Sequence, residues 1–303
     1  MNLPSGMQMF ERGWLSSNNV LFTGPGPTTL IDSGYVTHAA QTVALVEHAL
    51  GGKPLERVVT THLHSDHCGG NAALQARFGC SVAIPALDAA NVRDWRAEAL
   101  NFHLTGQQCP RFTAQETIEA GDELLLAGQT WQVLGAAGHD AHALVLYCPA
   151  ERILISADAL WRNGFGVIFP ELEGDSGFTE ERATLELIDT LDVDLVIPGH
   201  GPMFTDVKEA IKRAFNRLNF LQASPVRNAE NAVKVMLKFL LLERQQLVLA
   251  EVPALMQSIP LMQTIRMRYL DKSNDELAEW AVQGLIRAGA ARRDGDLLRN
   301  SDL

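Results

Sequence analysis

The sequence is poor in features that mark several classes of protein. Of its 303 residues only four are cysteines, and aromatic residues make up 7%. Positive charge is also scarce: 25 lysines and arginines stand against 36 aspartates and glutamates, which leaves a formal net charge of −11. This balance argues against a protein that mainly coats nucleic acid or anionic membrane.

The cysteines form no recognised motif. None of the four belongs to a CxxC pair, since they stand at Cys68, Cys80, Cys109 and Cys148. This spacing excludes a zinc knuckle and a thioredoxin-like redox motif, and the low cysteine content excludes a disulfide scaffold. Because free thiols are typical of a reducing compartment, we expect a cytoplasmic protein.

The chain also lacks long hydrophobic runs. Its first residues, MNLPSGMQMF, contain no basic segment followed by an apolar one, so we expect no secretory signal. The most apolar stretch of the C-terminal third is interrupted by Lys234, Lys238 and Glu243. A membrane-spanning helix needs about 20 mostly apolar residues in a row, so we expect no membrane partner.

Apolar residues are plentiful overall, at 47%, and a chain of this length can bury a substantial core. Strand-like and helix-like segments alternate through residue 206, which predicts a layered α/β domain over residues 1–206. We expect Thr179 to cap the last helix of this domain. The predicted strands are 19–23, 28–31, 55–61, 81–84, 123–126, 130–134, 143–147, 152–156 and 194–198, and the predicted helices are 40–50, 70–78, 88–100 and 179–191.

The remaining part, residues 207–303, is predicted to be a separate and mostly helical domain. Helical periodicity covers 207–221, 229–243, 260–270 and 274–288, and a hairpin is expected across Asp294-Gly295. Two helices followed by a small hairpin outline a winged-helix module. Such modules often bind DNA, but residues 271–303 carry five basic and seven acidic side chains, which is not a footprint for a phosphate backbone.

The densest chemical signal is the segment from His62 to His67. In an extended chain His62 and His64 point to the same side, and a turn at Ser65 can bring Asp66 and His67 to a second centre beside the first. Neutral imidazoles together with carboxylates suit zinc, iron or manganese. A polar loop with coincidental histidines is the alternative, and three histidines within six residues make it improbable.

Three more potential ligands follow predicted strands. His139 lies in an Ala-Gly-His-Asp segment, Asp158 comes after the strand 152–156, and His200 ends a Pro-Gly-His segment. Side chains in these positions project from the carboxyl edge of a sheet, where open α/β layers place their active sites. Each one alone could instead be a structural histidine in a turn or an aspartate that caps a helix.

The pattern His-x-His-x-Asp-His, then Gly-His, then Asp, then Pro-Gly-His resembles the metallo-β-lactamase superfamily over about residues 10–206. The resemblance implies an αββα sandwich and two metal ions, with zinc as the default and iron or manganese as alternatives. It also implies that the glycines at 69 and 70 let the backbone pass close to the metals. The implied ligands are His62, His64 and His139 for the first ion, Asp66, His67 and His200 for the second, and Asp158 as the bridge.

The residue in the bridging position indicates a branch of this superfamily. An aspartate there, Asp158, is similar to the glyoxalase II, lactonase and nuclease branches, whereas β-lactamases with a cysteine ligand carry it at this place. Di-iron flavoproteins of the same fold carry a glutamate where His64 stands, so electron transfer is disfavoured. We expect hydrolysis of a small ester, thioester or lactone by a metal-bridging hydroxide, with Asp66 orienting the nucleophile and passing a proton to the leaving group.

Three neighbours of these residues have candidate roles. His142 is expected to hydrogen-bond a metal ligand, Arg162 to meet a substrate carboxylate from the loop 161–166, and Cys68 to be a small packed residue. For His142 and Arg162 an ordinary structural role is the alternative. The metals would make the site locally positive, so the net charge does not exclude an anionic small molecule.

Two other functions remain open from the sequence. One is a metal-dependent endoribonuclease that cleaves RNA phosphodiesters, which the acidic composition disfavours. The other is a non-catalytic regulatory protein that binds metal, which the complete ligand set disfavours. For the C-terminal part, the resemblance implies a lid over the catalytic domain or a contact that supports a homodimer.

Overall fold

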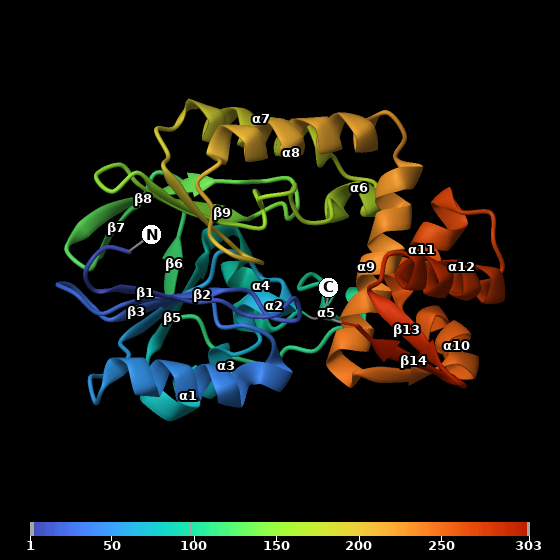
Figure 1. The fold of residues 1–303 in the computed structure, drawn as a ribbon. Coiled ribbons are helices and arrows are strands. Elements are labelled where there is room, and N and C mark those ends of the chain that lie inside the picture. The colour runs from blue at the N-terminus through green and yellow to red at the C-terminus, as the bar shows by residue number, and fades with distance from the viewer. Residues whose placement is uncertain (1–2, 97, 302–303) are drawn as a thin grey trace.

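Two β-sheets pack face to face and helices cover both outer faces (Figure 1). This arrangement is seen in a computed structural model, which describes residues 3–96 and 98–301. The predicted αββα sandwich is therefore confirmed. A helical extension with a small sheet of its own lies beside the sandwich, at the right of Figure 1.

The first sheet has six strands in sequence order, antiparallel from β1 to β3 and parallel from β3 to β6. Its outer face packs on two helices, α1 (Ala39–Leu50) and α3 (Asn71–Phe78), through an apolar core. Gly51 ends α1 in a left-handed conformation, as its place after the last apolar residue predicts. The strands are β1 (Met7–Phe10), β2 (Asn19–Phe22), β3 (Thr29–Ile31), β4 (Arg57–Val59), β5 (Ser81–Pro85) and β6 (Glu116–Ile118).

The second sheet has five strands in the order β11-β10-β9-β8-β7. Helices α7 (Phe178–Thr190) and α8 (Val207–Gln222) cover its outer face (Figure 1). Between the two sheets Trp131 is 1% exposed, and its ring meets that of Phe22 edge-on at 5.3 Å. The strands are β7 (Glu123–Leu126), β8 (Gln129–Gly135), β9 (Leu144–Cys148), β10 (Ile153–Ala157) and β11 (Leu195–Pro198).

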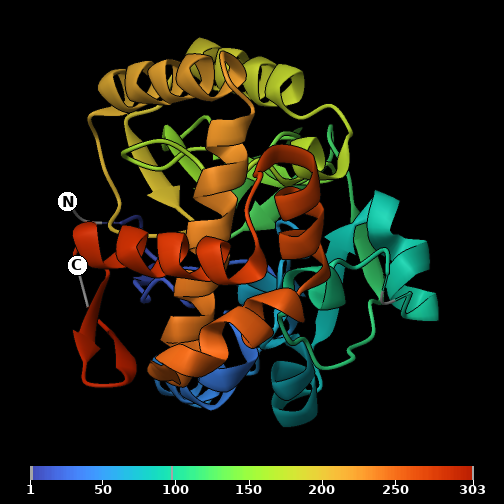
Figure 2. The same cartoon turned by 90° about the vertical axis from the view of Figure 1, so that its right-hand side faces the viewer.

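The C-terminal elements surround one apolar core. Their order is α9 (Val226–Arg244), β12 (Gln246–Val248), α10 (Val252–Gln257), α11 (Pro260–Tyr269), α12 (Asn274–Arg287), β13 (Ala291–Asp294) and β14 (Leu297–Asn300). Figure 2 shows α9 lying against the sandwich, with the hairpin of β13 and β14 at the far end of α12. The winged-helix assignment itself remains a prediction.

The predicted boundary between residues 206 and 207 falls at the start of α8. This helix buries Ala210, Ala214 and Leu218 in the same core as α7 and the second sheet. The separate core of the extension begins on α9, at Ala229. Packing therefore associates α8 with the sandwich, and the division at residue 206 remains a prediction.

Some elements differ from the sequence prediction. The predicted helix 88–100 contains residue 97, which lies outside the described residues, and α4 (Ala89–Asp94) ends where Trp95 adopts a positive φ of 49°. Thr179 is not a cap, because α7 begins at Phe178 after Gly177 and has no side-chain cap. Three short strands, β1, β6 and β12, were not predicted. The remaining short helices are α2 (Ser65–Cys68), α5 (Phe102–Thr105), α6 (Phe169–Glu173), and the 3₁₀ turns Val36–His38, Ala86–Asp88 and Leu249–Glu251.

The glycines after the histidine segment serve a packing purpose. A Cβ atom on Gly69 would lie 2.7 Å from the backbone nitrogen of Val36, and one on Gly70 would overlap the carbonyl oxygen of Ser33. The backbone thus passes close to the loop 33–36 that follows β3, and the close approach to the metals that the resemblance implies stays a prediction. Within residues 3–96 and 98–301, no helix combines the length and the apolarity that a membrane crossing requires.

Candidate metal centre

The seven predicted ligands meet at one edge of the sandwich, where the loops after four strands converge. β4 leads into the histidine segment, and α2 carries its second half. The loops after β8, β10 and β11 supply the other three residues. The side chains fall into three groups whose donor atoms lie within 4.8 Å of one another: His62, His64 and His139; His62, His67 and Asp158; Asp66, His67 and His200.

The first group consists of three imidazoles. Nε2 of His62 lies 3.1 Å from Nδ1 of His64, which lies 2.8 Å from Nε2 of His139. Burial lowers the pKa of His62 well below its usual value, and it lowers the pKa of His64 and of His139 to about 4. All three rings are therefore neutral at pH 7, with ring nitrogens directed at one point. Neutral nitrogens arranged in this way can hold a divalent cation.

The second group combines imidazoles with carboxylates. Nε2 of His200 lies 3.1 Å from Oδ2 of Asp66. Nε2 of His67 is buried without a hydrogen-bond partner among the described residues and lies 3.3 Å from Oδ1 of Asp158. Burial raises the pKa of Asp158, but His200 and His67 outweigh it and hold that pKa well below its usual value. The carboxylate is thus charged, as a metal ligand requires.

Hydrogen bonds on the far side of two histidines fix which nitrogen faces the centre. His67 donates from Nδ1 to Oδ2 of Asp32 at 2.8 Å, and His139 donates from Nδ1 to the carbonyl oxygen of Val167 at 2.5 Å. Both rings therefore present Nε2 to the cluster. Burial would lower the pKa of His67, but Asp158 and Asp32 raise it well above its usual value. A cation bound between these groups would displace that proton.

Asp32 is held as firmly as the ring that it orients. Its Oδ1 accepts the backbone N–H of Thr61 at 2.8 Å, and its Oδ2 accepts the hydroxyl of the same residue at 2.9 Å. The side chain is buried and the backbone has a positive φ of 57°. Sequence analysis missed this residue, although a polar Asp-Ser-Gly turn directly after a strand is a weak signal for it.

Two glycines leave room for the ligands. A Cβ atom on Gly199 would lie 3.0 Å from Cε1 of His67 and would overlap the carboxylate of Asp158. A Cβ atom on Gly166 would overlap the ring of His139. The absence of side chains at these positions lets the loops close around the centre.

Aromatic rings flank the centre on both sides. Trp14, which is 50% exposed, stacks on His200 at 5.5 Å with 10° between the planes. Trp161 donates from Nε1 to Oδ1 of Asp158 at 3.3 Å, so the predicted loop 161–166 does border the site. On the other side Phe169 meets His64 edge-on at 5.2 Å. Trp14 and Phe169 were missed, because only the fold brings them to the ligands.

The other predicted neighbours take different positions. Nδ1 of His142 bonds to Oδ1 of Asp88 at 2.9 Å rather than to a ligand. Arg162 is turned to the surface, where its Nε donates to Asp206 at 3.1 Å with the arginine side chain 57% exposed. The Arg162 hypothesis is therefore not supported, because Asp206 at the start of α8 holds the guanidinium there. Cys68 is fully buried in the core under the first sheet.

A cavity of about 300 Å³ opens beside His64. His142 and Phe169 form part of its wall. Four of its described lining residues are acidic, and none is a lysine or an arginine. These acidic residues are Asp88, Asp140, Glu173 and Asp175.

Comparison with known families agrees with this geometry. The family model described as the metallo-beta-lactamase superfamily matches residues 12–200, more than half of the chain. The chain belongs to the metallo-β-lactamase superfamily. The chain is 31% identical over 159 residues to a hydroxyacylglutathione hydrolase of Dechloromonas aromatica (strain RCB). The matched segment covers 52% of this chain and 49% of that protein.

Other relatives are more distant. A beta-lactamase-like protein 2 homolog of Caenorhabditis elegans is 24% identical over 200 residues, which are 65% of this chain and 60% of that protein. The matches thus span less than two thirds of the length of each of these two curated relatives. Among solved structures, a metallo-beta-lactamase family protein from Thermus thermophilus superposes with a TM-score of 0.59 at 18% identity, covering 99% of this chain and 100% of the other. A beta-lactamase domain protein from Burkholderia ambifaria gives a TM-score of 0.60 at 20% identity, with coverages of 100% and 94%. These two structures show a shared fold that includes the C-terminal extension.

Removing the Asp32 carboxylate should weaken metal binding. In Asp32→Ala the ring of His67 loses the partner that fixes its orientation, so we expect the affinity for zinc to fall about 10- to 100-fold. Competition with a chromophoric chelator measures the affinity. Asp206→Ala, which removes a surface carboxylate, serves as the control and should leave the affinity unchanged. Equal affinities in the Asp32 variant and the parent protein would contradict the role of Asp32.

The pair of Asp88 and His142 should stabilise the fold at low pH only. The hydrogen bond from His142 to Asp88 raises the pKa of the imidazole, so the fold favours its protonated form. That stabilisation is present in full below the unfolded-state pKa of about 6.5 and is lost as the pH rises through the higher folded-state value.

We therefore expect Asp88→Asn to destabilise the metal-free protein at about pH 5.5 and to have little effect at about pH 9. Because the His142 side chain is 35% exposed, the loss should stay below about 1 kcal/mol. Urea unfolding at both pH values measures it. An equal loss at the two pH values would show that the pair acts only through packing.

Proposed function

We propose that this protein is a dinuclear metal-dependent hydrolase that acts on a small ester, thioester or lactone. The observation that carries the proposal is the position of Asp158 between the two groups of donors. Its Oδ1 lies 3.3 Å from Nε2 of His67 and 3.8 Å from Nε2 of His200, whereas its Oδ2 lies 3.4 Å from Nε2 of His139. One carboxylate thus faces both halves of the centre, as a bridging ligand would.

The donor set suits two divalent cations. In the proposed arrangement Asp158 is shared, and zinc is the default ion for these nitrogen and oxygen donors, with iron and manganese as alternatives. Such ions, when bound, lower the pKa of water and polarise the bond under attack. His62, His64 and His139 would hold one ion, and Asp66, His67 and His200 the other.

Asp66 is the proposed proton carrier. Burial raises its pKa, but the hydrogen bond from His200 and the charge of His67 outweigh this and lower it, so the group is a carboxylate at neutral pH. Its side chain is 13% exposed, more than the side chains of His67 and His200 in the same group. Oδ2 faces Nε2 of His200 at 3.1 Å, so in the proposed arrangement this oxygen would hold the ion. The other oxygen would orient a nucleophile and later return a proton to the leaving group.

The matched relatives support hydrolysis of an acyl compound, because several are named hydroxyacylglutathione hydrolases. The surface beside His64 supports a small substrate rather than RNA. Its described lining residues include four carboxylates and no cationic side chain, an arrangement that repels a phosphate backbone.

A panel of substrates tests the proposal. The metal-loaded protein is assayed with thioesters, lactones, β-lactams and labelled RNA, each with and without a chelator. We expect chelator-sensitive turnover of at least one thioester, ester or lactone. Turnover of RNA alone would replace the proposal with the nuclease alternative, and no turnover by fully loaded protein would favour a regulatory role.

Asp66→Ala should lower kcat far more than it raises KM. Loss of a positioned proton carrier costs about 100-fold or more in rate, whereas substrate contacts elsewhere remain. Steady-state kinetics with the best substrate of the panel measures both constants, and metal content is determined on the same sample to detect a lost ion. An unchanged kcat would refute this role for Asp66.

A further inference from the structure

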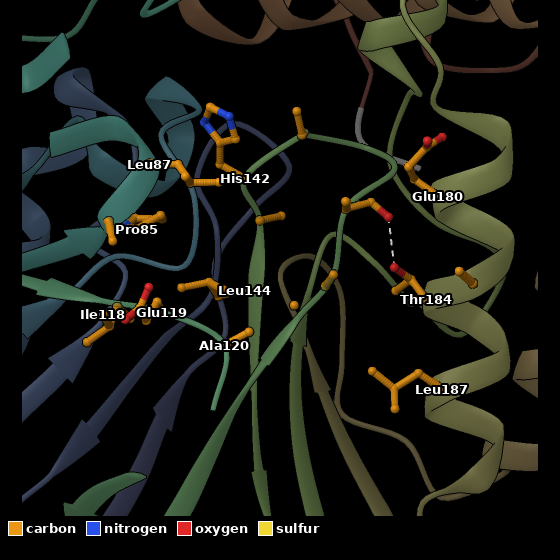
Figure 3. A pocket seen from close by; sticks show the side chains of 17 residues that line it. Pro85, Leu87, Ile118, Glu119, Ala120, His142, Leu144, Glu180, Thr184 and Leu187 are labelled. Carbon is orange, nitrogen blue, oxygen red and sulfur yellow. Dashed lines mark hydrogen bonds between the residues drawn. The ribbon is translucent and has the colours of Figure 1, made fainter. Parts of the chain in front are cut away.

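A second cavity, of about 480 Å³, lies between the ends of β5 and β6 and helix α7 (Figure 3). Leu87, Ile118 and Leu144 line one side of it, and Leu187 projects from α7 on the other. Ala183 lines it from α7 as well, at an exposed position of the helix. The walls are therefore mostly aliphatic, without aromatic side chains among the described lining residues.

The polar groups of this cavity do not favour a charged or strongly polar occupant. The hydroxyl of Thr184 already donates to the carbonyl oxygen of Ala137 at 2.7 Å, as Figure 3 shows. The two carboxylates of the lining belong to Glu119 and Glu180, and the described lining residues include no lysine or arginine. Among the described lining residues the only side-chain base is the imidazole of His142, which already bonds to Asp88. An anionic group would therefore meet two carboxylates and no free cation in this lining, whereas a hydrocarbon would bury apolar surface.

This cavity adjoins the one at the metal centre. Ala141 and His142 line both cavities. The same loop carries His139, so the segment 135–144 borders the centre and both cavities in turn. Because Ala141 and His142 border both cavities, the aliphatic cavity lies next to the space in which a substrate at the ligands would sit.

We infer that the substrate carries an uncharged hydrocarbon chain and that the aliphatic cavity binds this chain. The inference rests on the proposed hydrolase function and narrows its substrate class. The chain can belong to the acyl group or to the leaving alcohol or thiol, since either side of the scissile bond can extend along this loop.

Two ester series test the inference and distinguish the two sources. In one series the acyl group grows from acetyl to octanoyl, and in the other an acetyl ester carries an alcohol from methyl to octyl. Each buried methylene contributes about 0.8 kcal/mol, so we expect kcat/KM to rise about fourfold per methylene in one series until the cavity is full. An ω-carboxylate at the chain end should abolish the gain.

Two variants on the same helix make the test specific. Ala183→Phe fills the cavity from an exposed position. It should lower kcat/KM for the octyl or octanoyl ester relative to kcat/KM for the shortest ester of the same series. Glu186→Phe places the same ring on the exposed surface of α7, outside the lining residues, and should leave this ratio unchanged. Titration of the metal-free protein with octanol gives a readout without catalysis, and Ala183→Phe should weaken saturable binding about tenfold or more.

The outcomes separate the two proposals. If no ester is hydrolysed but octanol binds and Ala183→Phe weakens its binding, the hydrolase function fails and the cavity assignment stands. If esters are hydrolysed without dependence on chain length, or if Ala183→Phe and Glu186→Phe behave alike, the chain-binding inference is wrong. Absence of saturable octanol binding also contradicts it.

Discussion

One buried carboxylate, that of Asp158, lies between the two groups of donors and constrains how the loops around them pack. Asp158 is 5% exposed, and an isolated buried carboxylate would be costly. Burial raises its pKa, but His200 and His67 hold that pKa well below the usual value, and Nε2 of His139 lies 3.4 Å from its other oxygen. These three histidines belong to segments that follow different strands. The sandwich positions these strand ends so that one side chain can contact all three. Gly199 is needed for this contact, because a Cβ atom at its position would overlap the carboxylate of Asp158.

The C-terminal extension contacts the sandwich close to this centre. From α11, Arg268 donates to the carbonyl oxygen of Glu173 at 2.7 Å, and the hydroxyl of Tyr269 donates to that of Glu171 at 2.7 Å. Both carbonyls belong to α6, the short helix that begins with Phe169 beside His64. The extension thus supports one wall of the cavity at the metal centre. Its predicted role as a lid or a dimer contact remains a prediction.

The sequence predicted the layered fold and the set of residues that meet at the centre because both have local signals. Histidines within six residues are conspicuous, and His139, Asp158 and His200 each follow an apolar strand. Asp32 has no comparable signal, since its role depends on a ring 35 positions away in the chain. Trp14 likewise lies in an irregular segment, and its stacking on His200 joins opposite ends of the sandwich sequence. Long-range partners of this kind are set by tertiary packing alone.

In the proposed function Asp158 is a ligand shared by two divalent cations. X-ray diffraction from crystals of the zinc-loaded protein, with anomalous data collected on both sides of the zinc edge, tests it most directly. We expect two anomalous peaks in the cluster, each with an oxygen of Asp158 among its ligands. A single peak under saturating zinc, or two peaks that Asp158 does not join, would contradict it.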